Sequence, residues 1–210
     1  MKKQLIIATL LALLFLGVSL IVKYNSKPKY QNIFDEIYFG EESIFHIPYG
    51  YSSFSKIPGI HDIPARKDYE FDDSIIERYT DNTTIDSLSW STWFFFNFPE
   101  AIFSISFTSF LQEDTNIYIV YDYFEKKHLL VEKVYVIQSI SKYDRKHSKK
   151  VDTIKKCLDE SGVPVESIRK AADQLLYDKV IEDWITYTNS AFSKENIGKV
   201  TIERSPFFKD

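Results

Sequence analysis

Four consecutive segments rich in β-branched and aromatic residues constrain the fold of this chain most strongly. They cover residues 89–98, 102–111, 115–124 and 128–138, and this composition favours β-strands. The intervening segments 99–100, 112–114 and 125–127 are short enough for hairpins. Because strands joined by hairpins pair with their neighbours in order, the sequence predicts an antiparallel meander sheet.

The alternation of side chains along these strands predicts which face is buried. In the segment 102–111, Phe103, Ile105 and Phe107 alternate with serine and threonine, which is the period of two expected when one face is packed. The other face should be open, and Asp122 of the next strand falls on it.

Helical periodicity replaces this alternation after residue 140. Apolar residues recur every three or four positions in the segment 147–161, and Gly162 follows as a natural stop. A second helical pattern opens at Pro164 and continues to Ile185, and residues 200–203 are typical of one more short strand. The sequence therefore predicts an α+β fold, in which the C-terminal helices pack on one face of the meander sheet.

The N-terminus carries an apolar segment that predicts a transmembrane helix before this domain. Residues 5–22 form a run of 18 residues without a charge, which as a helix would be about 27 Å long, close to the hydrocarbon thickness of a bilayer. A cleaved signal peptide is the alternative, because Gly17 and Ser19 resemble a small-x-small cleavage site. The apolar run continues past that point, which favours an anchor.

We therefore divide the chain into a membrane anchor or signal sequence at 1–22, a basic linker at 23–30 and a single α+β domain at 31–210. The signal-like layout favours a domain on the extracellular side of the membrane. The single cysteine, Cys157, lies in a helical pattern, where a buried apolar role is the most common one. One cysteine forms no internal disulfide, so the core alone must stabilise the domain.

Charge is distributed unevenly along the domain. Residues 31–140 hold 7 Lys and Arg against 18 Asp and Glu, a net charge of −11, whereas residues 141–210 hold 14 against 12, a net charge of +2. Nucleic-acid binding is disfavoured, because phosphates require a basic surface. Anionic lipid headgroups would repel most of the domain, apart from the linker. A basic protein partner would be attracted.

The densest acidic stretch lies between residues 68 and 86. Its carboxylates are Asp68, Glu70, Asp72, Asp73, Glu77, Asp81 and Asp86, and its aromatic residues include Tyr69, Phe71 and Tyr79. A calcium loop that started at residue 81 would need an oxygen ligand at its fifth position and Gly at its sixth, where the chain has Ile85 and Asp86. A pair of catalytic acids is disfavoured, because adjacent residues on a strand, such as 72 and 73, point to opposite faces.

Two interpretations of these carboxylates remain open. One is a solvated loop and strand face, and the other is an acidic docking surface for a basic protein partner. In the second case the aromatic residues supply much of the affinity, while the charges set the association rate and the specificity. We take the ten residues named above as the predicted binding surface.

Motifs of known enzymes are absent from the sequence, which has no G-x-S-x-G, H-E-x-x-H, Walker or G-x-G-x-x-G pattern. Ser53 and Lys56 form an isolated S-x-x-K match without its companion motifs. The four histidines lack ligand spacing and are expected on the surface or in turns: His46, His61, His128 and His147. We therefore expect no enzymatic activity, no metal and no cofactor.

Five features of the sequence point to one known family. They are the N-terminal apolar segment, NIFDEIYF at 32–39, IPARKDYEFD at 63–72, the aromatic strands and the helical C-terminal half. In these features the chain resembles the TipC family of immunity proteins from Gram-positive bacteria. The resemblance implies a membrane-anchored protein that neutralises an LXG-type toxin of a type VII secretion system in interbacterial competition. It also implies that the toxin attacks lipid II outside the cell and meets an acidic surface on the sheet.

The sequence thus leads to a membrane-anchored immunity protein that occludes a toxin with a basic surface. Two alternatives from other classes stay open. One is an anchored envelope hydrolase that uses carboxylates or His61, and the other is a structural or sensory envelope module.

Overall fold

The computed structural model describes residues 30–40, 60–62, 77–80, 83–95, 101–141 and 144–209, with only the backbone described at 60–62, 77–80 and 95. The chain divides into two units, Met1–Gln31 and Asn32–Asp210, and the second contains all the elements below. The predicted anchor at 5–22 lies outside the described residues. Within the described ranges, no helix is long and apolar enough to cross a membrane.

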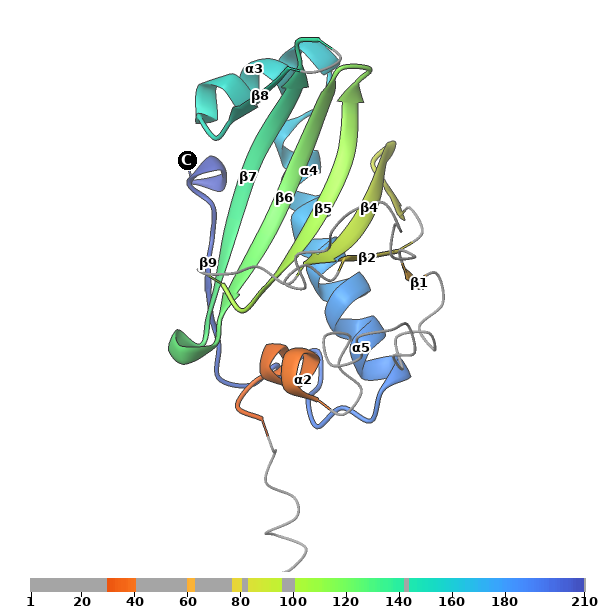
Figure 1. The fold of residues 1–210 in the computed structure, drawn as a ribbon, viewed down its shortest axis with the longest axis vertical. Coiled ribbons are helices and arrows are strands. Elements are labelled where there is room, and N and C mark those ends of the chain that lie inside the picture. The colour runs from red at the N-terminus through yellow and green to blue at the C-terminus, as the bar shows by residue number, and fades with distance from the viewer. Residues whose placement is uncertain are drawn as a thin grey trace, which may run out of the picture. The chain divides into compact units, whose positions relative to one another are not determined.

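The predicted meander forms the centre of the sheet (Figure 1). Its strands are β4 (Leu88–Phe95), β5 (Phe103–Gln112), β6 (Thr115–Phe124) and β7 (Leu129–Ser139), each antiparallel to the next. The outer strands are β1 (Ile60–Asp62) and β2 (Glu77–Thr80) beside β4, and β8 (Arg145–Ser148) beside β7. A short β3 (Thr83–Ile85) also pairs with β4.

Two features of the sheet differ from the prediction. The sheet is mixed rather than purely antiparallel, because β9 (Thr201–Glu203) pairs in parallel with β7. Residues 145–148 form β8 and pair with Val136–Ser139, although the predicted helical segment 147–161 included the last two of them. In both cases the free edge of β7 supplies backbone partners that the local pattern does not reveal.

The sheet's inner face forms the core, with the alternation that the sequence predicts. Ile105 of β5 lies opposite Phe94 and Tyr121 on the neighbouring strands, and all three are buried. The outer face is less open than expected, because Ser104 and Ser106 are both buried. Ser106 lies between Trp93 and Val120 in the ladder, and these larger side chains shield the short one.

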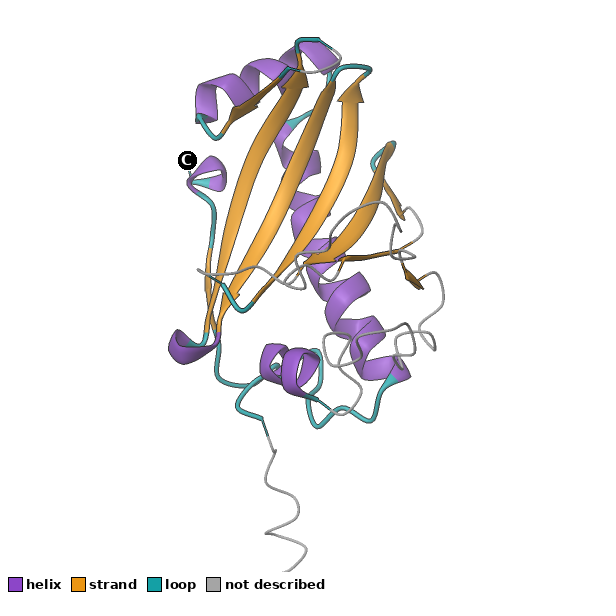
Figure 2. Cartoon of the chain, in the orientation of Figure 1, coloured by secondary structure: helices purple, strands orange, loops and turns teal. Residues whose placement is uncertain are grey.

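The helices cover the inner face (Figure 2). They are α3 (Val151–Ser161), α4 (Val165–Gln174), the π-helical segment η3 (Leu175–Ile181) and α5 (Glu182–Tyr187). Gly162 ends α3 in the left-handed conformation, with φ of 69°, which confirms the predicted stop. The last three segments follow one another without a break, so that one long helix spans the sheet, as the pattern from Pro164 to Ile185 predicts.

Three short elements complete the domain: α2 (Ile33–Phe39), η2 (Glu125–Lys127) between β6 and β7, and η4 (Pro206–Phe208). Asn32 caps α2, because its side chain accepts hydrogen bonds from Phe34 N and Asp35 N. Among the described residues, the core cluster runs from Ile33 to Phe207, with Phe208 packed against it. The described part of the unit Asn32–Asp210 therefore contains a hydrophobic core.

Candidate partner-binding surface

Most of the predicted acidic surface lies outside the described residues. This applies to Asp68, Tyr69, Glu70, Phe71, Asp72, Asp73 and Asp81. Glu77 and Tyr79 lie on β2, where only the backbone is described, and Tyr79 pairs with Trp93 of β4. The register thus joins β2, which lies within the acidic stretch, to the β4 edge of the meander. The role of these nine residues stays a prediction.

Asp86 is the one predicted residue whose side chain is described, and its charge is paired. It forms with Ser87 the two-residue turn between β3 and β4, in which both φ angles are positive, at 46° and 70°. Its Oδ1 accepts a hydrogen bond of 2.6 Å from Lys170 Nζ of α4. This hydrogen bond lowers the pKa of Asp86. The carboxylate therefore ties a turn to a helix.

The described part of the outer face is rich in aromatic and aliphatic side chains. Tyr118 of β6 and Tyr135 of β7 stack with ring centroids 5.0 Å apart and planes 3° apart. Lys149 Nζ lies 5.9 Å from the centre of the Tyr135 ring. Phe110 of β5 is 68% exposed. Such a surface can bury aromatic area against a partner.

Asp122, an acidic residue on the described part of this face, has its charge paired. Its carboxylate accepts a hydrogen bond of 2.5 Å from Ser104 Oγ and forms an ion pair with Lys133. The Asp122 side chain is 8% exposed, so it offers little charge to a partner. Burial raises the pKa of the neighbouring Tyr135 to about 12, so its hydroxyl stays protonated at neutral pH.

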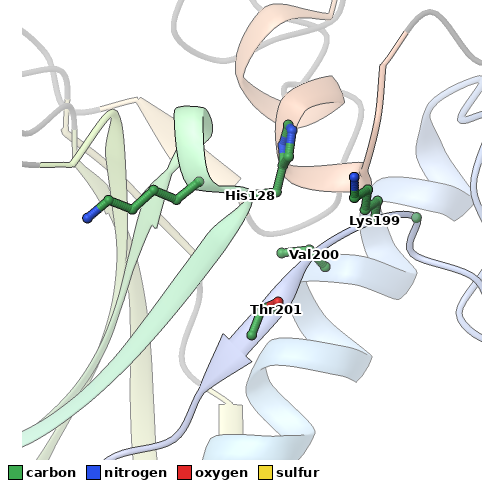
Figure 3. Close-up of a pocket in the computed structure, with 6 residues that line it drawn as sticks. His128, Lys199, Val200 and Thr201 are labelled. Atoms are coloured by element: carbon green, nitrogen blue, oxygen red, sulfur yellow. The ribbon is translucent and has the colours of Figure 1, made fainter.

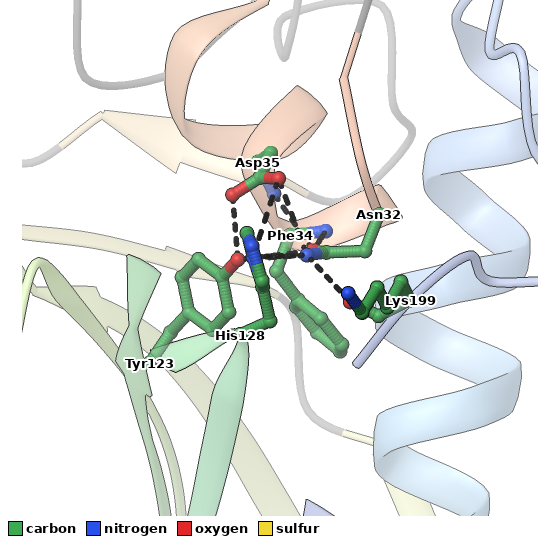
Figure 4. A network of polar contacts seen from close by, with 6 residues as sticks. All are labelled: Asn32, Phe34, Asp35, Tyr123, His128 and Lys199. Carbon is green, nitrogen blue, oxygen red and sulfur yellow. Dashed lines mark hydrogen bonds and ion pairs between the residues drawn. The ribbon is translucent and has the colours of Figure 1, made fainter. Parts of the chain in front are cut away.

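A buried polar network attaches α2 to one end of the sheet (Figure 4). The Tyr123 hydroxyl donates to Asp35 Oδ1 at 2.5 Å and accepts from Asn32 Nδ2 at 2.9 Å. Asn32 Nδ2 also donates to the Lys199 carbonyl oxygen at 3.2 Å and lies 3.5 Å from His128 Nδ1. Burial raises the pKa of Tyr123 well above its usual value. The first turn of α2 is therefore bound to β6, to the η2 turn and to the segment before β9.

Glu36 attaches the same helix to the C-terminal segment. Its carboxylate accepts hydrogen bonds from Trp184 Nε1 at 3.0 Å, from Ser190 Oγ at 2.5 Å and from Ala191 N at 3.1 Å. Glu36 is buried, and so is the indole of Trp184. Together with Asn32, Glu36 fixes the segment that enters the domain to elements more than 90 residues away in sequence.

Another buried carboxylate, Glu132, joins the sheet to the C-terminal segment. It accepts hydrogen bonds from the Tyr121 hydroxyl at 2.5 Å, from Arg204 Nη1 at 3.1 Å and from Ser205 N at 3.0 Å. Arg204 also forms an ion pair with Asp173 of α4. Each donor to Glu132 belongs to the scaffold, so this cluster stabilises the fold.

These polar clusters were not predicted, although the sequence contains signals for them. Asn32 precedes an apolar run and is followed by an acid at position 35, which is the pattern of a helix N-cap. Glu132 stands between Leu130 and Val134, in phase with the inner face. A charged residue at a core position indicates a buried partner, but its identity depends on the tertiary fold.

The described histidines and the cysteine lie as predicted. His128 ends the η2 turn in the left-handed conformation and is half-buried, and His147 is exposed on β8. Cys157 is buried and free, and burial raises the pKa of its thiol. No group of three or more His, Cys, Asp or Glu side chains that could hold a metal occurs among the described residues. His46, Ser53 and Lys56 lie outside them, and His61 lies on β1 with only its backbone described.

Comparison with known proteins identifies the family. No curated protein matches the sequence. Among solved structures, that of TipC2 from Streptococcus intermedius B196 is similar, with a TM-score of 0.66 and 19% sequence identity, over 86% of this chain and 99% of that chain. At this identity the likeness shows a shared fold. A family model described as TipC immunity protein-like matches residues 1–205, and the chain therefore belongs to this family of immunity proteins.

Proposed function

We propose that this chain binds and occludes a cognate LXG-type toxin, exported by a type VII secretion system, on the outer face of the membrane. The observation that carries the proposal is the match of an immunity-protein family model to residues 1–205. Immunity proteins of this family act on a toxin partner, so inhibition requires a binding surface rather than chemistry. The toxin would be one that attacks lipid II, as the resemblance implies.

The proposed anchor would hold the domain at the membrane surface. Residues 5–22 are long and apolar enough to span a bilayer as one helix. A toxin that attacks lipid II outside the cell meets its target at the membrane surface. An immunity domain held at the same surface meets the toxin at a high effective concentration.

The acidic stretch at 68–86 and the aromatic outer face supply the two parts that such a surface needs. β2, which carries Glu77 and Tyr79, pairs with β4 in the same sheet. The acidic residues would draw in a basic toxin, and Tyr118, Tyr135 and Phe110 would bury apolar area once it docks.

The test is complex formation with the LXG toxin encoded by a neighbouring gene. The domain, residues 29–210, should form a stable complex with it that weakens as salt is added. Asp72→Lys and Asp73→Lys should weaken it further, by about 1 kcal/mol or more for a charge at the interface. Asp152→Lys on the exposed side of α3 is the matched control for the change in charge. The absence of a complex at low salt would refute the proposal.

A further inference from the structure

The end of the domain that holds the start of α2 also holds a pocket edged by lysines (Figure 3). The pocket has a volume of about 320 Å³ and lies between the η2 turn and the segment that enters β9. It is lined by Lys127, His128, Gly198, Lys199, Val200 and Thr201. The Thr201 amide donates to the His128 carbonyl oxygen at 2.8 Å, which holds the two walls together.

The charge of these two segments is positive. Residues 125–128 and 198–201 contain three lysines, Lys126, Lys127 and Lys199, against one carboxylate, Glu125. All three lysines are exposed. The nearby Asp35 is buried and accepts hydrogen bonds from Tyr123 and Asn32, so its charge faces inward.

This is the end at which the chain enters the domain. Asn32 contacts the Lys199 carbonyl oxygen and lies 3.5 Å from His128 Nδ1. Nine residues, 23–31, separate Asn32 from the apolar run at 5–22, and fully extended they span about 30 Å at most. A chain anchored by that run therefore keeps Asn32, which contacts Lys199 and lies beside His128, within about 30 Å of the bilayer surface.

Another basic segment among the described residues lies at the far end of β7. The strand β8 pairs with Val136–Ser139, whereas β9 pairs with Leu129 to Val131. Lys146 of β8 is opposite Gln138, and the nine steps along the strand from Leu129 to Gln138 correspond to about 30 Å. Lys146, and Lys155 on α3, thus provide exposed lysines away from the entry end.

We propose that Lys126, Lys127 and Lys199 form a contact surface for anionic phospholipid headgroups, with the pocket receiving a headgroup phosphate. The inference rests on the proposed function in one respect, the membrane anchor. Lysine ammonium groups bind phosphate as point charges, and each lysine near an anionic membrane strengthens binding about fivefold. The contact would orient the tethered domain, so that the sheet extends away from the bilayer.

Lysine acetylation of the full chain tests this contact. The chain is inserted into nanodiscs of phosphatidylcholine, with or without phosphatidylglycerol, and the reaction of each lysine is followed by peptide mass spectrometry. Lys126, Lys127 and Lys199 should react about fivefold more slowly in the anionic discs. Lys146 and Lys155 should react equally in both. Equal rates at all five lysines, or equal protection of Lys146, would overturn the proposal.

A matched pair of double variants separates a specific surface from the loss of net charge. Lys127→Gln with Lys199→Gln should abolish the protection of Lys126 in anionic discs. Lys146→Gln with Lys155→Gln removes the same charge and should leave that protection unchanged. If both pairs behave alike, the surface is not specific and the inference fails.

The same variants distinguish this inference from the proposed function. Both pairs should bind the LXG toxin as the unaltered chain does, because the toxin surface is assigned to the acidic stretch and the outer face. Loss of lipid protection with toxin binding intact supports the contact surface. A chain that fails to insert into any disc refutes the anchor and the lipid contact together, while an absent toxin complex refutes the immunity function alone.

Discussion

Replacement of Arg204 by methionine should destabilise the domain more than the simultaneous replacement of Arg204 and Glu132. The side chain of Glu132 is 0% exposed and that of Arg204 is 35% exposed. In Arg204→Met the buried carboxylate keeps only the hydrogen bonds from Tyr121 and Ser205. A buried charge left without its partner costs about 3 kcal/mol.

The second change should restore part of this loss. Glu132→Gln removes the charge, and its amide oxygen still accepts a hydrogen bond from Tyr121 or Ser205. The remaining cost of the double variant is the loss of charge-assisted hydrogen bonds, about 1.5 kcal/mol. The double variant should therefore be more stable than Arg204→Met alone by about 1.5 kcal/mol.

Urea unfolding of residues 29–210, followed by the fluorescence of the tryptophans, measures the difference. With a slope of about 2 kcal/mol per molar urea, the midpoint of the double variant should lie about 0.7 M above that of Arg204→Met. The single variant Glu132→Gln completes the cycle and gives the coupling energy. If the double variant is no more stable than Arg204→Met, then the unpaired carboxylate is not the origin of the cost, and the reasoning is wrong.

Three further predictions follow from single positions. Ser87→Gly should raise the free energy of unfolding by about 0.5–1 kcal/mol, because φ at Ser87 is 70° and glycine adopts such angles without strain; an unchanged or lower urea midpoint would contradict this. Tyr135 should stabilise the fold below pH 10 and lose this contribution as the pH rises toward its folded pKa of about 12; the difference in unfolding free energy between the unaltered chain and Tyr135→Phe should fall across that interval, and a flat difference would exclude the effect. Cys157 should react with a thiol reagent only when the protein unfolds, since it is buried and its pKa is raised; fast labelling of the native protein would show that the α3 helix opens.

Local pattern predicted the central strands and the C-terminal helices with few errors. The segment 115–124 forms β6 at the bounds that the sequence predicts, and Gly162 ends α3 as expected. Both results depend on neighbouring residues alone: alternation sets the two faces of a strand, and a glycine in the left-handed conformation ends a helix. The predicted start of α3, at residue 147, is four residues too early, because residues 145–148 form β8 and pair with the edge of β7.

The same difference between local pattern and long-range contacts applies to the candidate surface. The acidic composition of 68–86 is visible in the sequence, and so is the set of aromatic residues on the strands. The ion pairs of these charges are not visible in the sequence. Asp86 pairs with Lys170, which lies 84 residues away in the chain, and Asp122 pairs with Lys133 on the neighbouring strand. A carboxylate that the sequence counts as free can therefore belong to a structural ion pair.

The amino-acid pattern alone is enough to predict the class of fold, the two faces of the meander, the buried role of the lone cysteine and the resemblance to immunity proteins. Each of these follows from composition or from contacts between residues close in the chain. The tertiary structure decided the parallel pairing of β9, the attachment of α2 through Asn32 and Glu36, and the burial of Glu132 beside Arg204. The partners in these contacts lie 72 to 148 residues apart, and no local pattern encodes which distant donor a buried carboxylate will meet when the chain folds.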